Sequence, residues 1–549
     1  MQRSTSCACV LATAAFCLAA LRIDHGLVNS GMAPGPGLTL DESFNLEQGV
    51  YLVESLRKHG PLIFTPAAVR EVFGSPRYLP DHPPLGRLLL GFAHEWTGWM
   101  IPGAESSPFH VPAARLGACL ALAALVYGMS EWAGRAWGLP TAAASAVFLL
   151  LMPQFVGHAR LATLETATCL AWFAALLPFL VWWTGDEPPG TARACFSGVP
   201  FGLLMLTKMQ GVLLPPLIVV WALWRFRRRA IRPLMVWCLA GGCVFFAAWP
   251  WLWLDPLTHT LQYLGRASRR PELYVWYLGE RFADRQVPWH FPFVMTLITV
   301  PAYVLTGIVS RLSAGVLDRT EQLLLASALW PLLVFALPGT PVYDGTRLFL
   351  CIMPALAILA ARGFCLGVFR LLAARRNPAG APCSRWIPVA VLLTLAVLAR
   401  AATSGAVLNP CAISEYGDII GGARGAARLG MEASYWGEGL NGEFWALVPE
   451  NSTVMVAPVS HQFQLRDIEA LVPVVQKRRI RLVPFLYNSA EQRGLLLLLH
   501  RLADLRPVLR EIPPGADLRI EVRHDGVVLA RLIDTTHATW TVTPEESRP

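Results

Sequence analysis

Charged residues are scarce in this chain of 549 residues. They make up 15% of the sequence, whereas an ordinary soluble domain carries about 25%. Hydrophobic residues make up 54%, and the mean hydropathy is +0.45. This balance excludes a water-soluble protein. The formal charge of +9 comes almost entirely from Arg in short loops between apolar runs, which is typical of a membrane protein and not of a nucleic-acid-binding surface.

Several motifs of soluble enzymes are absent. The chain has no CxxC pair, no D-x-D, no H-E-x-x-H and no glycine-rich loop after a strand, which argues against a nucleotide site or a zinc ribbon. Most of the 12 cysteines lie in or beside apolar runs, where Cys acts as a small hydrophobic residue. We therefore expect no cofactor, with a divalent metal held by Asp81, His82 and His158 as an alternative.

Long apolar runs dominate what is present. A membrane-spanning helix needs roughly 20 apolar residues, and the first run is interpreted as a spanning helix and not as a signal peptide, because no clear A-x-A cleavage site follows. Two runs that meet at Lys208 are short, and could form a single tilted helix. In all we expect about eleven transmembrane helices, over 7–23, 109–129, 138–156, 162–183, 195–208, 209–224, 233–253, 289–310, 321–337, 347–369 and 386–405.

Arginine-rich loops predict the orientation. They fall within 225–232, 311–319 and 370–385, and eleven spans place all three on the side of the N-terminus, which is cytoplasmic by the positive-inside rule. The fold class is therefore a polytopic α-helical membrane protein. We expect a transmembrane domain over 1–405 with a large outer loop at 24–108, followed by a small extracytoplasmic α/β domain over 406–549.

The outer segments have patterns of their own. Residues 43–58 are amphipathic and predict an interfacial helix, and 84–101 predict a surface or re-entrant segment. In the C-terminal part, two strands are expected around the turn Asp525-Gly526. The further elements expected there are strands at 452–459 and 480–486 and helices at 467–477 and 490–502, with the hairpin strands at 518–522 and 527–532.

Acidic residues of the first outer loop are candidates for catalysis. Asp41-Glu42 follows a Gly/Pro-rich approach, and a carboxylate just outside a membrane can take a proton from a sugar acceptor. Asp81-His82 precedes two prolines and is a candidate supporting loop. Surface loops are rich in carboxylates, so each of these residues can equally be an ordinary solvated group.

Four further charged residues lie at the ends of apolar runs. Arg160, Lys208 and Arg347 are cations at predicted outer helix ends, where charges need a partner or a function, and a guanidinium there can bind phosphate. Arg160 and Glu165 are five positions apart, so a direct pair on one helix face is not assured. The alternative for each cation is an interface anchor or a side chain that reaches the lipid headgroups.

Taken together, these motifs resemble a family. Asp41-Glu42, the His82-Pro83-Pro84 motif, the Arg160/Glu165 pair and the segment 343–354 resemble, in this order, the family 39 group of GT-C glycosyltransferases, which contains the protein O-mannosyltransferases and lipid A aminoarabinose transferases. The resemblance covers most of 38–370. It implies an enzyme in a bacterial inner (plasma) membrane, with its active site on the extracytoplasmic side.

The resemblance also implies an activity and roles. The enzyme would move a sugar from a polyprenyl-phosphate donor to a lipid, glycan or protein acceptor, with inversion and without any nucleic-acid partner. Asp41 would be the general base and Glu42 would help to place it or the acceptor. The donor phosphate would be held by Arg160, Lys208 and Arg347, with Asp81, His82 and Glu165 in support.

Two departures from the family pattern are visible. Glu165 stands where the group commonly has Asp, and the C-terminal part does not resemble the MIR domain of the eukaryotic O-mannosyltransferases. Tyr435-Trp436-Gly437-Glu438 predicts an aromatic anchor at the interface, with a position over the active site as the alternative. A transporter of lipid-linked sugars and an oligosaccharide ligase of the same fold are the alternative functions.

Overall fold

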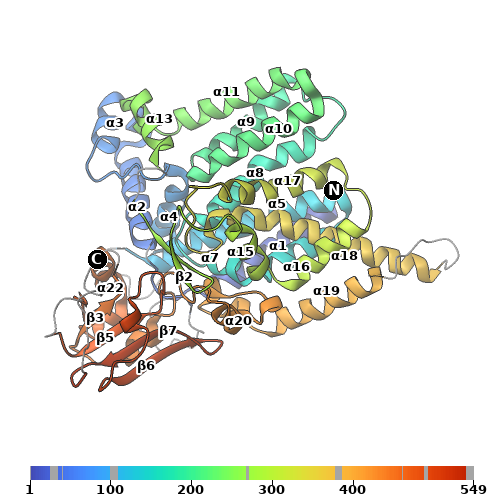
Figure 1. The fold of residues 1–549 in the computed structure, drawn as a ribbon. Helices are drawn as coiled ribbons and strands as arrows, with labels where there is room; N and C mark the ends of the chain where they lie inside the picture. The colour runs from blue at the N-terminus through green and yellow to red at the C-terminus, as the bar shows by residue number, and fades with distance from the viewer. Residues whose placement is uncertain are drawn as a thin grey trace.

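The chain forms a large bundle of helices followed by a region that contains a mixed β-sheet, as the computed structural model shows (Figure 1). The structure describes residues 2–24, 35–39, 41–98, 109–266, 271–376, 386–459, 462–486 and 492–538. The longer helices of the bundle are α1 (Gln2–Ala20), α2 (Glu42–His59), α4 (Pro84–Thr97), α5 (Val111–Trp137), α6 (Leu139–Leu150), α8 (Glu165–Trp182), α9 (Thr191–Met205), α10 (Leu214–Phe226), α11 (Ile231–Ala247), α15 (Phe291–Thr299), α16 (Ala302–Ser313), α17 (Arg319–Phe335), α18 (Met353–Arg376) and α19 (Trp386–Thr403).

Short elements connect these helices. They include the antiparallel pair β1 and β2 and the 3-10 turn η6, which leads into α18. Their bounds are α3 (Pro66–Phe73), α7 (Pro153–His158), α12 (Trp251–Leu254), α13 (Pro256–Leu264), β1 (Tyr274–Tyr277), β2 (Glu280–Ala283), η1 (Gly60–Phe64), η4 (Met209–Leu213), η5 (Arg227–Ala230) and η6 (Arg347–Ile352).

The polytopic helical fold is confirmed, but the number of long spans is smaller than expected. Within the described residues, six helical stretches are long and apolar enough to cross a membrane, or seven if the bent pair α15 and α16 counts as one span. That pair turns by 107° at Pro301, where a helix is interrupted. The runs expected at 138–156 and 195–208 form helices of only 12 and 15 residues, α6 and α9.

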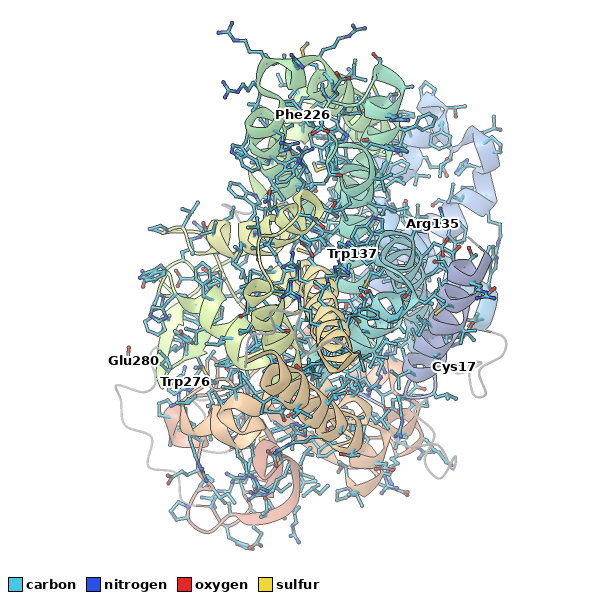
Figure 2. All side chains as sticks on the ribbon, turned by 90° about the vertical axis from the view of Figure 1, so that its right-hand side faces the viewer. Cys17, Arg135, Trp137, Phe226, Trp276 and Glu280 are labelled. Atoms are coloured by element: carbon cyan, nitrogen blue, oxygen red, sulfur yellow. The ribbon has the colours of Figure 1, made fainter. Side chains whose placement is uncertain are left out.

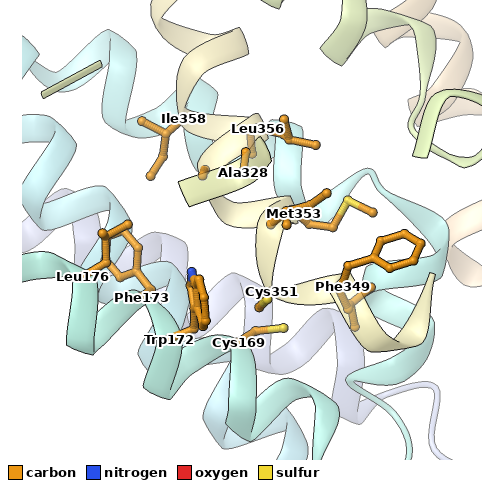
Figure 3. Packing of buried hydrophobic residues seen from close by; sticks show 14 of the residues in the cluster. Cys169, Trp172, Phe173, Leu176, Ala328, Phe349, Cys351, Met353, Leu356 and Ile358 are labelled. Carbon is orange, nitrogen blue, oxygen red and sulfur yellow. The ribbon is translucent and has the colours of Figure 1, made fainter. Parts of the chain in front are cut away.

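The bundle is held together by a continuous apolar core. Helix α8 contributes Trp172, Phe173 and Leu176 to this core, and Figure 3 shows them with Leu356 and Ile358 of α18. Helix α1 contributes Ala15 and Ala19 to the same core. The two cysteines of this view, Cys169 and Cys351, are buried and free, as apolar filling residues are.

The C-terminal region contains a five-stranded sheet. Its strand order is β4-β3-β5-β7-β6, with β3 parallel to β4 and β5 and the remaining pairs antiparallel. Its strands and main helices are β3 (Thr453–Ala457), β4 (Arg481–Pro484), β5 (Leu495–Leu499), β6 (Asp517–His524), β7 (Val527–Asp534), α20 (Gly422–Arg428), α21 (Gly442–Leu447), α22 (Phe463–Leu471) and α23 (Pro473–Lys477).

Most of the elements expected in this region are confirmed. Strands β3 and β4 and the hairpin of β6 and β7 lie where they were expected, and the expected helix over 467–477 is split into α22 and α23 at Pro473. The prediction of a helix over 490–502 is wrong. Its five leucines form the central strand β5, which has partners on both edges and is buried at its middle.

The two ends of the bundle differ. Figure 1 shows α2, α4 and the sheet region toward one end, and the turn between α10 and α11 and the C-terminal part of α18 toward the other, where α1 also starts. The first of these carries the predicted arginine-rich loop 225–232. The predicted loop 370–385 begins within α18, and 377–385 lie outside the described residues. Figure 2 views the molecule from this end, with Phe226 of α10 labelled. The predicted acidic loop and the sheet region thus lie at one end of the bundle.

Candidate active site

The segment that leads into α2 is anchored by a buried ion pair. Glu42, the first residue of α2, is fully buried, and its carboxylate accepts hydrogen bonds from Arg115 of α5 at 2.7 and 2.8 Å. The same guanidinium donates to the carbonyl oxygens of Pro36 and Gly37, each at 2.7 Å. Glu42 also accepts from the backbone N–H of Ala162 at 2.7 Å, which ties the segment to the approach of α8.

Because both oxygens of Glu42 are occupied, its geometry suits positioning of the neighbouring Asp41 and leaves no oxygen free for an acceptor. Arg115 was missed in the sequence analysis. The signal was present, since an arginine inside the run VPAARLGACLALAAL must be paired when it is buried.

Arg347 is the centre of the site. It follows a turn in which Asp344 and Gly345 both have positive φ, so the chain enters η6 and α18 with the guanidinium directed at three carboxylates. Its Nη2 donates to Asp41, its Nε donates to Glu165 at 2.6 Å, and its Nη1 donates to Asp344 at 3.1 Å. Residues from the segment that leads into α2, from α8 and from the approach to α18 therefore meet at one guanidinium.

Lys208 joins the same cluster through Glu165. Its Nζ donates to Oε1 of Glu165 at 2.6 Å, and both side chains are buried. A buried ion pair survives only when its charges are compensated, and here one carboxylate holds two cations, Lys208 and Arg347. The turn between α9 and η4 thereby presents an ammonium group next to the guanidinium.

The C-terminal region covers this cluster. The guanidinium carbon of Arg347 lies 4.5 Å from the centre of the Trp436 ring, and the indole N–H of Trp436 donates to Asp344 at 3.0 Å. Arg501 also donates to Asp344, at 3.2 Å. Trp436 thus lies over the candidate active site, which is the alternative that the sequence left open, and the interpretation as an interface anchor is wrong.

Trp436, Asp344 and Arg501 come from separate parts of the chain, and the sequence carried no spacing that joined Asp344 to Arg501. We define the cation cluster as Asp41, Glu165, Lys208, Asp344 and Arg347.

A cavity of about 380 Å³ adjoins the cation cluster. Lys208, His82 and Asp81 line its polar part, and its walls are largely apolar, with Val212, Leu213, Val334, Phe335, Tyr343 and Leu348. Burial holds the pKa of His82 at about 3, against the opposing effect of Asp81. The imidazole is therefore neutral at pH 7, and its buried Nδ1 has no hydrogen-bond partner among the described residues.

Besides Glu42 and His82, the predicted residues Asp81 and Arg160 also lie outside the cation cluster. Asp81 is paired with Arg87, whose Nη2 donates to it at 2.9 Å. Arg160 is buried and donates to the carbonyl oxygen of Asn409 at 3.4 Å, and no ion pair within the described part of the chain joins it to an acidic side chain. Its expected contact with a donor phosphate in the cluster gains no support from this geometry.

The metal alternative also finds no assembled site. Across the residues that the structure describes, no three His, Cys, Asp or Glu side chains gather where they could hold an ion. Asp81 is committed to Arg87, and His158 packs edge-on against Trp436 with ring centres 5.3 Å apart.

Part of the chain matches a known protein family. Residues 81–253 match the family described as dolichyl-phosphate-mannose-protein mannosyltransferase. The matched part contains Asp81, His82, Arg160, Glu165 and Lys208, whereas Asp41 and Arg347 lie outside it. No curated protein matches the sequence.

Three solved structures are similar at low identity. ArnT from Cupriavidus metallidurans, solved in the apo state and bound to undecaprenyl phosphate, is 16% identical over 95% of this chain and 97% of that chain, with a TM-score of 0.46. The apo Archaeoglobus fulgidus oligosaccharyltransferase is 12% identical over 87% and 64% of the two chains, with a TM-score of 0.45. The S. cerevisiae Pmt1-Pmt2 complex bound to the sugar donor is 14% identical over 50% and 38%, with a TM-score of 0.31.

The match over 81–253 confirms the resemblance that the sequence motifs indicated, and this segment is similar to the dolichyl-phosphate-mannose-protein mannosyltransferase family of membrane glycosyltransferases.

Proposed function

We propose that this protein is an inverting glycosyltransferase that moves one sugar from a polyprenyl-phosphate donor to a hydroxyl acceptor at the extracytoplasmic face of a bacterial plasma membrane. The observation that carries the proposal is the shared guanidinium of Arg347, which joins Asp41 to Glu165 beside a largely apolar cavity. The acceptor hydroxyl belongs to a lipid, a glycan or a protein.

The cavity suits the donor. A polyprenyl-phosphate sugar carries an apolar chain and a phosphate, and the cavity offers apolar walls ending at Lys208, with Arg347 bonded to the same carboxylate. Developing negative charge on a leaving phosphate is stabilised by preorganised cations in a site that excludes water. Glu165 acts here as a positioning residue, because it holds Lys208 and Arg347 together and does not itself need to touch the donor.

The chemistry follows from this placement. The acceptor oxygen attacks the anomeric carbon from the face opposite the phosphate, and the bond from that carbon to the phosphate oxygen breaks. The electron pair of the broken bond leaves with the polyprenyl phosphate, whose charge Lys208 and Arg347 balance. The acceptor proton passes to the carboxylate of Asp41, a general base of the kind that contributes about 10²–10⁴-fold to rate.

In the structure Arg347 pairs with Asp41, so the base is partly neutralised by the cation that the phosphate would need. Because a phosphate competes for the guanidinium, donor binding draws Arg347 away from Asp41 and leaves the carboxylate free to accept a proton. Base activation is thereby coupled to donor occupancy.

The proposal is tested with full-length protein in lipid nanodiscs. Undecaprenyl-phosphate mannose and undecaprenyl-phosphate arabinose are supplied as donors, together with a mixture of lipid, glycan and peptide acceptors that carry free hydroxyl groups. GDP-mannose serves as the soluble comparison, and the release of undecaprenyl phosphate is measured. We expect consumption of a lipid-linked donor only, and NMR of the product should show the anomeric configuration opposite to that of the donor.

A matched pair of lysine variants accompanies this assay. Lys208→Met should lower donor consumption at least about tenfold, since it removes a charge at the site of the leaving phosphate. Lys58→Met removes an exposed lysine of α2 that pairs with Glu71 and should leave the rate unchanged. Equal rates for both variants, or consumption of GDP-mannose alone, would overturn the proposal.

A further inference from the structure

A second cavity lies between the first outer segment and the C-terminal region. Its volume is about 80 Å³, and it shares no lining residue with the donor cavity. Thr39 and Ser43 line one side, and Tyr435 and Trp436 line another. Strands β3, β4 and β5 and helix α22 supply an apolar floor, which includes Val456, Leu465, Ile468, Leu482 and Leu497.

This cavity reaches the cation cluster through Trp436, which lines it and also covers Arg347. Arg347 in turn bonds to Asp41, and the cavity wall includes Thr39 and Ser43 from the segment that carries Asp41. The donor cavity reaches the same cluster from another side, through Lys208. The cation cluster is thus approached by two separate cavities, as a two-substrate transfer requires.

The chemistry of the lining restricts what the cavity can hold. Its floor is formed by aliphatic side chains, and its polar groups include Ser43, whose hydroxyl donates to Asp467, and Gln464 of α22. Burial raises the pKa of the Asp467 carboxyl. A bound water needs roughly 10–15 Å³ of such space, so the cavity admits a group of several atoms and excludes a polyprenyl chain.

We infer that this cavity is the acceptor subsite, and that it takes the apolar group of a hydroxyl compound, of the size of one amino-acid side chain, with the hydroxyl directed at Asp41. This inference rests on the proposed function for its catalytic meaning. The C-terminal region thus selects the acceptor, because α22 and the sheet form the floor and Trp436 joins that floor to the cation cluster.

The test uses a small probe that does not require turnover. Full-length protein in nanodiscs is titrated with 2-(4-fluorophenyl)ethanol, and binding is followed by ¹⁹F NMR after subtraction of empty nanodiscs. Ile468→Trp and Gln464→Trp each place a large ring in the cavity from the face of α22 that lines it. Ile468 is a partly buried apolar position, and Gln464 is a partly buried polar one. Arg466→Trp places the same bulk on the exposed side of that helix and serves as the matched control.

We expect saturable binding to the wild type and to Arg466→Trp, and affinity at least tenfold lower in both cavity-filling variants, with unfolding temperatures within a few degrees of the wild type. Wild-type binding no greater than that of empty nanodiscs, or unchanged affinity in Ile468→Trp and Gln464→Trp, would overturn the inference.

A parallel measurement of undecaprenyl-phosphate binding separates this inference from the proposed function. Probe binding lost in the two filling variants, together with no binding of undecaprenyl phosphate by the wild type, supports the subsite and removes the donor assignment.

Discussion

Arg347 bonds to Asp41 through Nη2 and to Glu165 through Nε. One planar guanidinium therefore connects the candidate base to the carboxylate that also holds Lys208. Lysine cannot reproduce this arrangement, because its ammonium is a single point of charge on a flexible stem. Both the charge and the planar geometry of Arg347 are therefore needed to hold Asp41 and Glu165 together.

Arg347→Lys is accordingly expected to lower sugar transfer by at least about tenfold, equivalent to 1.4 kcal/mol of transition-state stabilisation. The measurement is donor consumption by protein in nanodiscs. Arg319→Lys, at a partly exposed arginine that pairs with Asp186, is the control and should behave as the wild type. A variant Arg347→Lys with full activity would show that charge alone suffices.

Glu165→Gln tests whether the carboxylate of Glu165 stabilises the buried cations Lys208 and Arg347. Removal of the carboxylate leaves Lys208 and Arg347 buried without the anion that they share, and breaking a buried pair in this way costs about 3–5 kcal/mol. A clear fall in thermal unfolding temperature in detergent is expected. Glu71→Gln breaks the exposed pair with Lys58, which is worth about 0–1 kcal/mol. Equal stability of the two variants would contradict a buried, shared anion.

Several parts of the fold could be predicted from sequence, because they depend on local composition. Membrane helices follow from apolar length, and the hairpin of β6 and β7 follows from Asp525-Gly526 between two strand patterns. The leucine run of β5 could not be assigned in this way. Its periodicity does not distinguish a buried strand from a helix, and pairing with β3 and β7 decides the matter.

The candidate site was predicted only where charge stood out in an apolar setting. Lys208, Glu165 and Arg347 were visible because charges at the ends of membrane helices are rare. Asp344 and Arg501 are 157 positions apart, so only the tertiary fold joins them. Arg160 shows the converse, since its similar setting placed it among the phosphate ligands, whereas its described contact is the carbonyl of Asn409.

Trp436→Ala tests the cover over the cation cluster. The ring lies on the guanidinium of Arg347, and a cation–π contact is worth about 0.5–2 kcal/mol, so transfer should fall roughly two- to thirtyfold. Trp436→Phe keeps an aromatic face and should recover part of the rate, which separates stacking from simple loss of volume. Trp289→Ala, at an exposed tryptophan, should have no effect, and a matching loss there would implicate general destabilisation.

His82 predicts a pH dependence of stability. Its pKa is about 3 in the folded protein and about 6.5 when unfolded, so below pH 6.5 the unfolded chain binds a proton that the folded chain does not. Stability is therefore complete above pH 6.5 and declines as the pH falls toward 3. His82→Gln should flatten this decline in thermal unfolding, measured from pH 7 to 4. An unaltered slope would mean that the imidazole protonates in the folded state.

The most direct test of the account compares binding and turnover in Asp41→Asn. The variant removes the base and, at the same time, releases Arg347 for the phosphate. We predict that undecaprenyl phosphate binds at least as tightly as to the wild type, while sugar transfer falls about 100-fold or more. Transfer at the wild-type rate would contradict the assignment of Asp41 as the base, and weaker binding of undecaprenyl phosphate would contradict the competition for Arg347.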